Sequence, residues 1–336
     1  MNAASKPFDG THKYIRITDI DEITSEYKED SIVSPAAEID EHYRVKENDI
    51  LFARTGASTG KTYLYNHNDG RLYYAGFLIR MNVSPQNDSR FIFYQTQTLC
   101  YKKWVQVMSM RSGQPGINSQ ELSSYRCFLP KLEEQQRIAN LLALIDQRIS
   151  IQNKVIERYQ SLIRAITQTC FQGKYEYSQI PLSEIAPNIA SGKSKPTAGK
   201  YPLYGSTGII GTCSSGAYKG EMVLVARVGS IGQVQLINTS GCGITDNTLI
   251  IDSGELNRYV YFFLKTFDFH KITSGTTQPL ITGGSLKRIS VPILPATKRG
   301  LFISLLSAIE QRKKIEQELL QYYLQSKSYV LANMFI

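Results

Sequence analysis

The sequence lacks the features that mark zinc-binding, disulfide-rich, secreted and membrane-spanning proteins. Its five cysteines and four histidines form no CxxC pair and no other ligand-like spacing. It contains no apolar run of the roughly 18 residues that a transmembrane helix needs, and the polar stretch from Met1 to Gly10 does not resemble a signal peptide. We therefore expect a cytoplasmic protein with reduced, mostly buried thiols and without a metal site. The cysteines are Cys100, Cys127, Cys170, Cys213 and Cys242.

The charge balance is compatible with a polyanionic partner. Lys and Arg together number 38 against 29 Asp and Glu, which gives a formal net charge of +9. Neutralisation of phosphates by Lys and Arg supplies most non-specific DNA affinity, although many basic proteins bind no nucleic acid. The length of 336 residues and the hydrophobic content of 42% predict two folded domains rather than a disordered chain.

The chain contains an internal duplication. Residues 114–118 (Gln-Pro-Gly-Ile-Asn) return 164 positions later as residues 278–282 (Gln-Pro-Leu-Ile-Thr). All matching segments keep one order along the chain, which a single duplication explains and chance does not. The other matches are 49–56 with 222–229, 91–94 with 259–262, Leu129-Pro130 with Leu294-Pro295, and 141–148 with 305–312.

Each copy begins with a region of Gly, Tyr and short alternating apolar runs, which predicts strands and tight turns. A long helix follows. In the first copy it extends from Glu133 to about Cys170 without Pro or Gly, and Gly173 stands just beyond it as a stop signal. Such a helix is roughly 55 Å long at 1.5 Å per residue. Its apolar seam is Ile138, Leu142, Ile145, Ile149, Ile156, Tyr159, Ile163, Ile166 and Cys170, interrupted by Gln152.

The second helix is predicted from about Gly300 to Asn333, with a less regular seam. Two long helices with apolar stripes bury them by packing together, and Gln152 and Arg312 would help to fix their register. Homodimerisation through the helices is the alternative. The second seam is Leu301, Leu305, Ala308, Ile315, Leu319, Tyr322 and Tyr329, with Arg312 and Ser326 intruding.

At several motifs the sequence resembles the specificity subunit of type I restriction–modification systems, and the resemblance covers nearly the whole chain. The motifs are Gln-Pro-x-Ile-x-x-x-x-Leu at 114–122, Leu129-Pro130, Leu-Glu-Glu-Gln-Gln-Arg-Ile at 132–138, and Ala-Leu-Ile-Asp at 143–146. In the second copy Pro295 and residues 309–312 fit, but Lys-Arg-Gly at 298–300 replaces the Glu-Gln-Gln-Arg lead.

The resemblance implies an α+β protein: two similar mixed α/β target recognition domains, separated by two long helices packed as an antiparallel coiled coil with pseudo-two-fold symmetry. The expected boundaries are 1–130 and 175–296 for the domains, and 131–174 and 297–336 for the helices. Each domain would recognise one half of a split double-stranded DNA site. The helices would act as spacer and as docking platform for two methyltransferase (modification) subunits, which restriction (translocase and nuclease) subunits join. The chain itself would carry no catalytic residue and need no cofactor.

The first copy departs from the family at its start. The second copy opens with residues 181–185 (Pro-Leu-Ser-Glu-Ile), which lead to a basic loop at 191–196. The first copy has no counterpart, because Lys13-Tyr14-Ile15 already aligns near Lys200-Tyr201-Pro202. The first domain is therefore expected to lack the opening strand and loop.

Motifs for catalysis are incomplete. Residues 56–62 (Gly-Ala-Ser-Thr-Gly-Lys-Thr) resemble a phosphate-binding P-loop, but only three residues separate the glycines where four are needed. Residues 205–211 do not form the Gly-x-Gly-x-x-Gly of dinucleotide-binding proteins. No consecutive prolines occur, so the Asn/Asp-Pro-Pro-aromatic signature of amino-methyltransferases is missing. The sequence thus indicates that any methyl transfer comes from another subunit.

Contacts with DNA require side chains that reach base edges or phosphates from loops. Arg54 and Arg227 occupy matching turns, each followed by a Gly-rich loop, although a salt bridge or a carbonyl cap would also explain an Arg at either position. Base-contacting residues should differ between the copies, whereas shared residues suit scaffold or phosphate contact. The candidate DNA-binding residues are Arg54, Lys61, Arg111, Ser112, Gln114, Lys193, Lys195, Arg227, Ser274 and Gln278.

Two other functions remain open at this point, namely a duplicated scaffold or adaptor for protein partners and a single-chain enzyme. Matching loops that keep Arg and Gly while their neighbours diverge favour DNA recognition over the scaffold. The lack of a convergent nucleophile–base or carboxylate constellation counts against the enzyme. We expect a DNA site of two short half-sequences about one helical turn apart, near 34–36 Å, or somewhat more.

Overall fold

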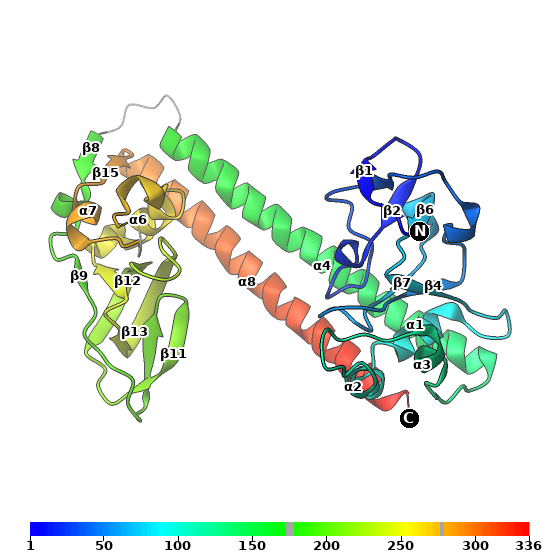
Figure 1. The fold of residues 1–336 in the computed structure, drawn as a ribbon. Coiled ribbons are helices and arrows are strands. Elements are labelled where there is room, and N and C mark those ends of the chain that lie inside the picture. Colours follow the sequence, from blue (N-terminus) through cyan, green and yellow to red (C-terminus); the bar gives the residue numbers. More distant parts are fainter. Residues whose placement is uncertain (173–177, 276–278, 336) are drawn as a thin grey trace. The chain divides into compact units, whose positions relative to one another are not determined.

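The computed structural model describes residues 1–172, 178–275 and 279–335. They form two compact units, one of Met1–Lys154 with Gln317–Ile336 and one of Val155–Glu316. Each unit contains a mixed α/β domain and a part of both long helices (Figure 1). The first and second domain below are the parts of the two units that lie outside these helices.

The first domain is built on an antiparallel sheet in the order β5-β4-β7. Its central strand β4 (Asp49–Ala53) is buried along its whole length, because Ile50 and Phe52 join one core cluster and Leu51 and Ala53 another. Two strand pairs, β2–β6 (parallel) and β1–β3 (antiparallel), complete the strands. The other elements are β1 (Ser5–Pro7), β2 (Lys13–Ile15), β3 (Val33–Pro35), β5 (Thr62–Leu64), β6 (Leu72–Tyr74), β7 (Leu78–Asn82), α1 (Ser89–Gln95), α2 (Leu99–Met108) and α3 (Ser119–Ser123).

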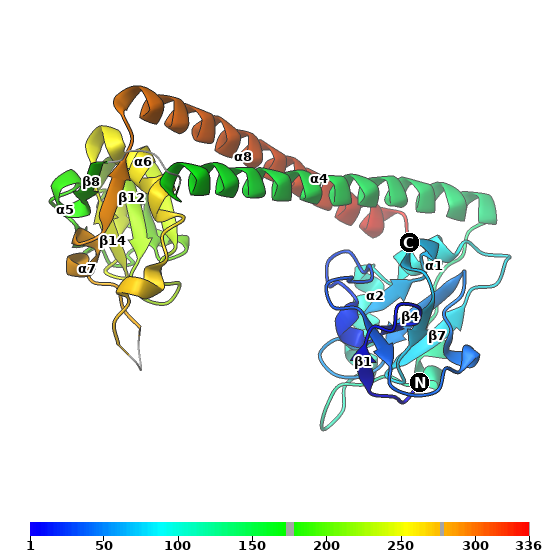
Figure 2. The same ribbon diagram turned by 90° about the horizontal axis from the view of Figure 1, so that it is seen from above.

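The second domain has a six-stranded sheet in the order β11-β10-β13-β12-β14-β9 and a separate antiparallel pair of β15 with β8. Helix α6 (Asn257–Leu264) lies against β12 (Figure 2) and buries Tyr259, Val260 and Phe263 in the core that also contains Val223 and Val225. The other elements are β8 (Ser178–Pro181), α5 (Leu182–Ile185), β9 (Ala190–Ser191), β10 (Tyr201–Gly205), β11 (Gly208–Cys213), β12 (Tyr218–Ala226), β13 (Val234–Ile244), β14 (Thr248–Ile251), α7 (Gly283–Lys287) and β15 (Ser290–Ile293).

The two domains share one hydrogen-bonding plan, which confirms the duplication. The amide of Ala53 donates to the carbonyl of Lys61 (2.8 Å), and that of Ala226 to the carbonyl of Gln233 (2.9 Å). Strand β2 pairs in parallel with β6 as β10 does with β13. Asn118 caps the N-terminus of α3 and Thr282 caps that of α7, each in a capping box. The second domain alone has β8, α5 and β9, as its extra opening segment predicts.

The long helices are α4 (Leu132–Gln172, 41 residues) and α8 (Ala296–Asn333, 38 residues). Within the first unit, Lys327 pairs with Asp146 (2.7 Å), while Val330 and Leu331 pack near Ile138 and Leu142. In these contacts the residue numbers increase along α8 as they decrease along α4, so the two helices are antiparallel, as predicted. In the second unit the ring of Phe302 packs edge-on against that of Phe171, with centroids 5.3 Å apart.

The seam predicted for α4 is confirmed, because every one of its residues is buried or half-buried, and Gln152 is buried with them. The seam predicted for α8 is wrong by one position. The predicted residues lie on the exposed face, and so does Arg312, which pairs with Glu316 on the same helix. The buried or half-buried residues include Phe302, Leu306, Ile309, Lys313, Glu316, Leu320, Tyr323, Lys327 and Val330, which lie one position after the predicted ones.

The error has a physical cause. Three of the inward positions of α8 carry charged side chains, Lys313, Glu316 and Lys327, whereas the neighbouring outward positions carry Leu, Ile and Tyr. An apolar repeat therefore identifies the wrong face. The charged inward residues are tolerated because their ends find partners, as Lys327 does with Asp146. The outward face of α8 remains apolar and exposed.

Three further expectations can be compared with the structure. No helix among the described residues is long and apolar enough to span a membrane. The described residues also hold no group of three or more His, Cys, Asp or Glu side chains arranged to bind a metal ion. All five cysteines are free, but Cys100 and Cys127 are exposed, so the expectation of mostly buried thiols is only partly correct.

Candidate nucleic-acid interface

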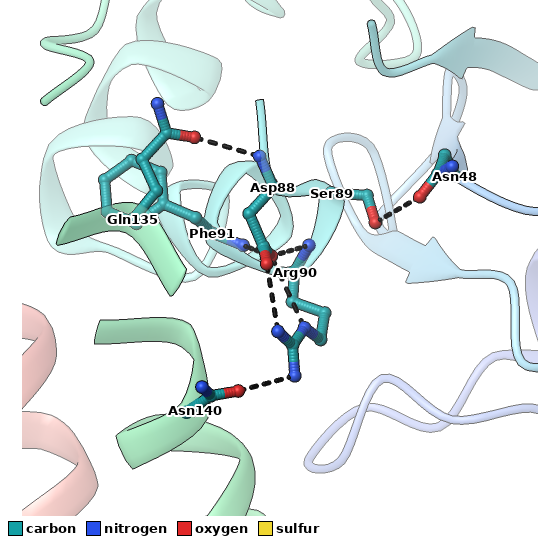
Figure 3. A network of polar contacts seen from close by, with 7 residues as sticks. All are labelled: Asn48, Asp88, Ser89, Arg90, Phe91, Gln135 and Asn140. Carbon is teal, nitrogen blue, oxygen red and sulfur yellow. Dashed lines mark hydrogen bonds and ion pairs between the residues drawn. The ribbon is translucent and has the colours of Figure 1, made fainter. Parts of the chain in front are cut away.

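The first domain is fixed to α4 by a buried polar network (Figure 3). Gln135 is only 2% exposed, and its amide oxygen accepts a hydrogen bond from the Asp88 backbone (3.0 Å). Its amide nitrogen donates to the Pro130 carbonyl (2.8 Å). Arg90 donates to Asn140, one turn further along α4 (2.9 Å). The Gln at this position of the Leu-Glu-Glu-Gln-Gln-Arg motif is thus a structural link between domain and helix.

The second domain is attached to α8 in a related way. Arg299 occupies the position of Gln135, and its guanidinium donates to the Leu294 carbonyl (3.5 Å). Arg258, the counterpart of Arg90, donates to Ser307 on α8 (3.3 Å). The Lys-Arg-Gly sequence at 298–300 therefore still supplies a hydrogen-bond donor, Arg299, to the second domain, although it differs from the Glu-Gln-Gln-Arg motif.

A second shared contact uses the acidic residue of the Ile-Asp/Glu-Gln-Arg motif. In the first unit the hydroxyl of Tyr94 donates to Asp146 (2.9 Å), which also pairs with Lys327. In the second unit Tyr261 donates to Glu310 (2.9 Å), which also pairs with Lys265. The motifs that resemble the family thus serve the junctions between domains and helices.

The candidate DNA-contacting residues lie at the other end of each central strand. Strand β4 begins at Asp49, next to the network of Figure 3, where Ser89 bonds Asn48. It ends at Ala53, roughly 13 Å further at 3.3 Å per residue. Arg54 follows directly. In the second domain Glu221, near the start of the matching run of β12, pairs with Arg258 at the junction, and Arg227 follows the end of the strand.

We call residues 53–61 the Arg54 turn and residues 226–233 the Arg227 turn. Both turns are held by the same bonds. The amide of Ile117 donates to the carbonyl of Arg54 (2.9 Å), and that of Ile281 to the carbonyl of Arg227 (3.0 Å). The residues that follow the Gln-Pro pairs, Ile117 and Ile281, are therefore bonded to the Arg turns in both domains, which the sequence did not predict.

Each Arg turn is closed by a glycine that no other residue replaces without strain. Gly60 (φ +84°) and Gly232 (φ +77°) have left-handed backbones. A Cβ atom on Gly60 would lie 2.5 Å from Val105, and one on Gly232 would lie 2.6 Å from Phe269. The glycines thus let the turn pack closely on the next element.

The structure brings some of the predicted residues of the first domain together and separates others. Arg54 is exposed, and its side chain has no partner among the described residues. The Gln114 amide lies over Gly56, 3.0 Å from where a Cβ atom would be. Lys61 is half-buried and lies 3.7 Å from Glu22. Arg54 and Gln114 thus share one exposed surface.

The loop before Gln114 is held differently from what the sequence suggests. Ser112 is exposed, but Arg111 donates to the carbonyls of Met108 and Met110 and pairs with Glu121. Bonds from the Asn118 backbone and then from Arg111 hold the pKa of the Glu121 carboxyl below its usual range. Arg111 therefore acts inside the domain as a carbonyl cap and ion-pair partner.

In the second domain, Arg227 is half-buried, and its Nε atom is buried without a hydrogen-bond partner among the described residues. The hydroxyls of Thr245 and Thr248 are in the same situation. Lys193 and Lys195 are exposed on a loop whose Ser194 amide donates to the Ile244 carbonyl. This basic loop thus runs beside the Thr245–Thr248 segment, to which Arg227 is also bonded.

Two further candidates are Ser274 and Gln278. Ser274 is exposed, and its backbone exchanges two hydrogen bonds with that of Leu280. The second candidate, Gln278, lies outside the described residues. Ser274 is therefore held beside Leu280, which is followed by Ile281, the residue bonded to Arg227.

Sequence reasoning missed the turn that lies beside each Arg. The Arg54 amide donates to the carbonyl of Phe77 (3.1 Å), and the Arg227 amide to that of Asn247 (3.0 Å). Phe77 and Asn247 are both exposed, and Phe77 has 63% of its surface accessible. The backbones of 75–78 and 245–248 are bonded alike, but their side chains are Ala-Gly-Phe-Leu and Thr-Asp-Asn-Thr. The sequence gives no signal for this turn, because the shared feature is a backbone bond.

A cleft of the first unit, with a volume of about 1580 Å³, lies elsewhere. It opens among the loops of the first domain and the parts of α4 and α8 in this unit. Many of its charged groups are carboxylates, which repel DNA phosphates. The cleft is therefore a poor candidate for the nucleic-acid interface. Its carboxylates include Glu26, Glu29, Glu47, Asp69, Asp88 and Asp146.

Comparisons with known proteins agree with this picture. The chain is 24% identical over 323 residues to the type I restriction enzyme MjaVIII specificity subunit of Methanocaldococcus jannaschii, a match that covers 91% of this chain and 67% of that protein. The fold resembles the crystal structure of a type I restriction–modification S subunit from M. genitalium (TM-score 0.71, 16% identity, 99% of this chain and 90% of that one). It also resembles a chain from work on complex assembly and conformational transition of the type I R-M system (TM-score 0.52, 15% identity, 95% and 90%).

The family profile described as "Type I restriction modification DNA specificity domain" matches twice, over residues 1–158 and 172–322. The two matches correspond to the two copies of the internal duplication and together cover most of the chain. The chain therefore belongs to the family of type I restriction–modification DNA specificity proteins.

Proposed function

We propose that this specificity subunit recognises a bipartite DNA sequence, with one Arg turn in contact with each half-site. Specificity subunits are the non-catalytic DNA-recognition components of the restriction–modification complex. The observation that carries the proposal is the pair of Arg turns. Both have the same backbone bonds, and both lie at the end of the central strand away from the helix junction. The side chains beside the Arg54 turn differ from those beside the Arg227 turn.

The shared and the divergent residues suggest a division of roles. Arg54 and Arg227 are common to both domains, so we assign them to phosphate contact, together with Lys193 and Lys195. Phe77 and Asn247 occupy equivalent exposed positions but differ in chemistry, so we assign them to base contact. An Asn amide forms two hydrogen bonds with adenine, whereas an aromatic ring contacts the methyl group of thymine.

The partners of the subunit follow from the outward faces of α4 and α8. Leu141 and Ile151 on α4 are exposed, and so are Leu305 and Ile315, which occupy the equivalent positions on α8. An exposed apolar surface on a helix marks a protein contact. Because this surface is present once in each copy of the repeat, it suits two copies of one partner, which we take to be two methyltransferase subunits. Restriction subunits would join that core.

The long helices act as the spacer in this proposal. With 41 and 38 residues, they are each about 60 Å long at 1.5 Å per residue. The half-sites would then lie about one helical turn of DNA apart, or somewhat more. Deleting the same whole number of turns from both helices should shorten the unspecified gap between the half-sites.

The test is to express the chain with its cognate methyltransferase and map the methylated sites on a genome. We expect one motif of two short half-sequences with a fixed gap. The variant Phe77→Asn should change the preferred bases of one half-site only. Arg54→Ala should weaken binding to all sequences alike and lower the slope of log K against log salt by about 0.9, the value for one phosphate contact.

Lys131→Ala supplies a matched control, since Lys131 is exposed at the start of the junction, away from the Arg54 turn. Its half-site preference should remain that of the parent protein. Methylation at a single uninterrupted motif would contradict the proposal. If the chain bound the methyltransferase but the assembly bound no DNA, the scaffold function would be favoured.

A further inference from the structure

The second domain has a further element at the end where Arg227 lies, namely the hairpin of β10 and β11. Strand β11 is the outermost strand on one side of the six-stranded sheet (Figure 1). Gly205 of β10 pairs with Gly208 of β11. Between them, Ser206 and Thr207 form a two-residue turn. The hairpin is therefore a two-stranded ribbon with a tight tip at the border of the sheet.

Two polar side chains hold this tip against the loops that we assign to DNA contact. The Ser206 hydroxyl donates to the carbonyls of Val228 (3.1 Å) and Asn247 (3.2 Å). Val228 belongs to the Arg227 turn, and Asn247 to the turn beside it. The Gln235 amide donates to the Ser206 carbonyl (3.1 Å). The tip thus has a fixed position next to both loops, which suits a residue that must meet a ligand in one geometry.

The tip exposes one hydroxyl and one apolar side chain. Thr207 is exposed, and Ile209 has 63% of its surface accessible. Ile210 is also exposed, but it lies over Gly205, where a Cβ atom would be 2.9 Å from its side chain. A single exposed Ile is ordinary on a protein surface. This one, however, directly follows a tip that is bonded to both DNA loops.

The charges around the hairpin indicate a nucleic-acid ligand. Residues 185–220 contain four Lys, all of them exposed, and no Asp or Glu. The basic loop reaches the same turn as the tip, because the Gly192 amide donates to the Thr248 carbonyl (3.0 Å). Asp246, exposed in that turn, would repel a phosphate but accepts a hydrogen bond from the amino group of cytosine. Phosphates are thus favoured around the tip, and base edges at it. The lysines are Lys193, Lys195, Lys200 and Lys219.

The first domain has a different structure at the equivalent place. The Ala75 amide donates to the Ile15 carbonyl (3.0 Å). The Thr245 amide donates to the Tyr204 carbonyl at the same distance, so Ile15 and Tyr204 are equivalent. After Ile15 the chain forms a 3-10 turn, Ile17–Asp19, where the second domain has its hairpin tip. Elements that read bases should differ between two domains that read different half-sites, and the hairpin meets this condition.

We infer that the β10–β11 hairpin enters the major groove of the half-site bound by the second domain, where Thr207 and Ile209 contact base edges. The inference rests on the proposed function and adds a second base-reading element to Asn247. The major groove, about 12 Å wide, admits a two-stranded ribbon, whereas the minor groove is only about 6 Å wide. A Thr hydroxyl donates to or accepts from a base edge, and an apolar side chain suits the methyl group of thymine.

The first test maps the methylated motif of the chain assembled with its methyltransferase. Thr207→Ala and Ile209→Ser change exposed residues, so the domain should still fold. Each should make at least one position of the same half-site degenerate and leave the other half-site and the gap unchanged. Ser215→Ala is the matched control, because Ser215 is exposed beyond the far end of β11, and its motif should be that of the parent protein.

The outcomes of this mapping separate the two levels of the argument. A parent protein without a bipartite motif would contradict the proposed function. A bipartite parent motif that both hairpin variants leave unchanged would overturn the inference alone. The inference would also fail if the hairpin variants altered the half-site that Phe77→Asn alters, since Phe77 belongs to the first domain.

The second test replaces thymine by uracil, which lacks the methyl group that thymine presents in the major groove. The probe is a duplex with the mapped motif and one such replacement in the half-site of the second domain. At one position the replacement should weaken binding by the parent complex about fourfold, the value for one buried methyl-sized group. The same replacement should weaken binding by the Ile209→Ser complex less than about twofold. Equal losses at every position, or a half-site without an A·T pair, would refute the contact of Ile209.

Discussion

The junction between the first domain and α4 allows a quantitative test through Gln135→Ala. The substitution removes hydrogen bonds to the Asp88 amide and to the Pro130 carbonyl, and also one to Asn87. Each buried backbone group left without a partner costs about 1–3 kcal/mol. Since two such groups are affected and Pro130 is half-buried, where water replaces part of the loss, we expect the free energy of unfolding to fall by about 2–4 kcal/mol.

The assay is urea unfolding of the chain, monitored at Trp104, which packs against the core of the first domain. Gln136→Ala supplies the matched control, because Gln136 is the exposed neighbour on the same helix turn and its loss should change stability by about 0.5 kcal/mol or less. The reasoning would be refuted if both variants lost the same free energy. It would also fail if the Trp104 transition of Gln135→Ala coincided with that of the parent protein.

Two further predictions concern the Arg54 turn and the junction of the second unit. Gly60→Ala should lower the free energy of unfolding by about 1–3 kcal/mol, because Gly60 has a left-handed backbone and lies against Val105, whereas Gly113→Ala, with open space around it, should be nearly neutral in the same urea titration. Burial alone would lower the pKa of Lys265. The contacts with Tyr261 and Glu310 outweigh this effect, so the pKa of Lys265 lies above the ordinary Lys value of 10.5. A Lys whose pKa is raised by folding contributes its full stabilisation at a pH below the pKa of the unfolded chain. This stabilisation is lost as the pH rises through the pKa of the folded protein. The stability difference between the parent and Lys265→Met should therefore shrink above about pH 10.5, and a difference that stays constant there would contradict this account.

The duplication and the helices could be predicted because they depend on features that persist along the chain. Gln-Pro-x-Ile and Leu-Pro recur at near-constant offsets, and the seam of α4 is apolar at almost every inward position. The seam of α8 could not be placed, since Lys313, Glu316 and Lys327 occupy inward positions and only their partners in three dimensions make this tolerable. Periodicity reports which face is apolar, which is a different question from which face is buried.

The candidate DNA-binding residues show a similar limit. Arg54 was identified because it recurs as Arg227, and both lie at the same end of their domains. Arg111 was identified only as a cation in a loop, and the structure places its donors on carbonyls and on Glu121. Phe77 was not among the candidates, because an exposed Phe between Gly and Leu carries no signal of its own. Its position beside Arg54 depends on a backbone bond across the sheet.

The backbone bonds of the turn at 75–78 and 245–248 have a consequence for the history of such proteins. The amide that enters this turn donates to the neighbouring strand, and the amide that leaves it donates within the turn, in both domains alike. Mutations at the exposed tip therefore leave the frame intact, and on the proposed function they alter the preferred bases without a large loss of stability. Diversification of target choice would then require few substitutions, so that closely related organisms with the same assembly could methylate different sites.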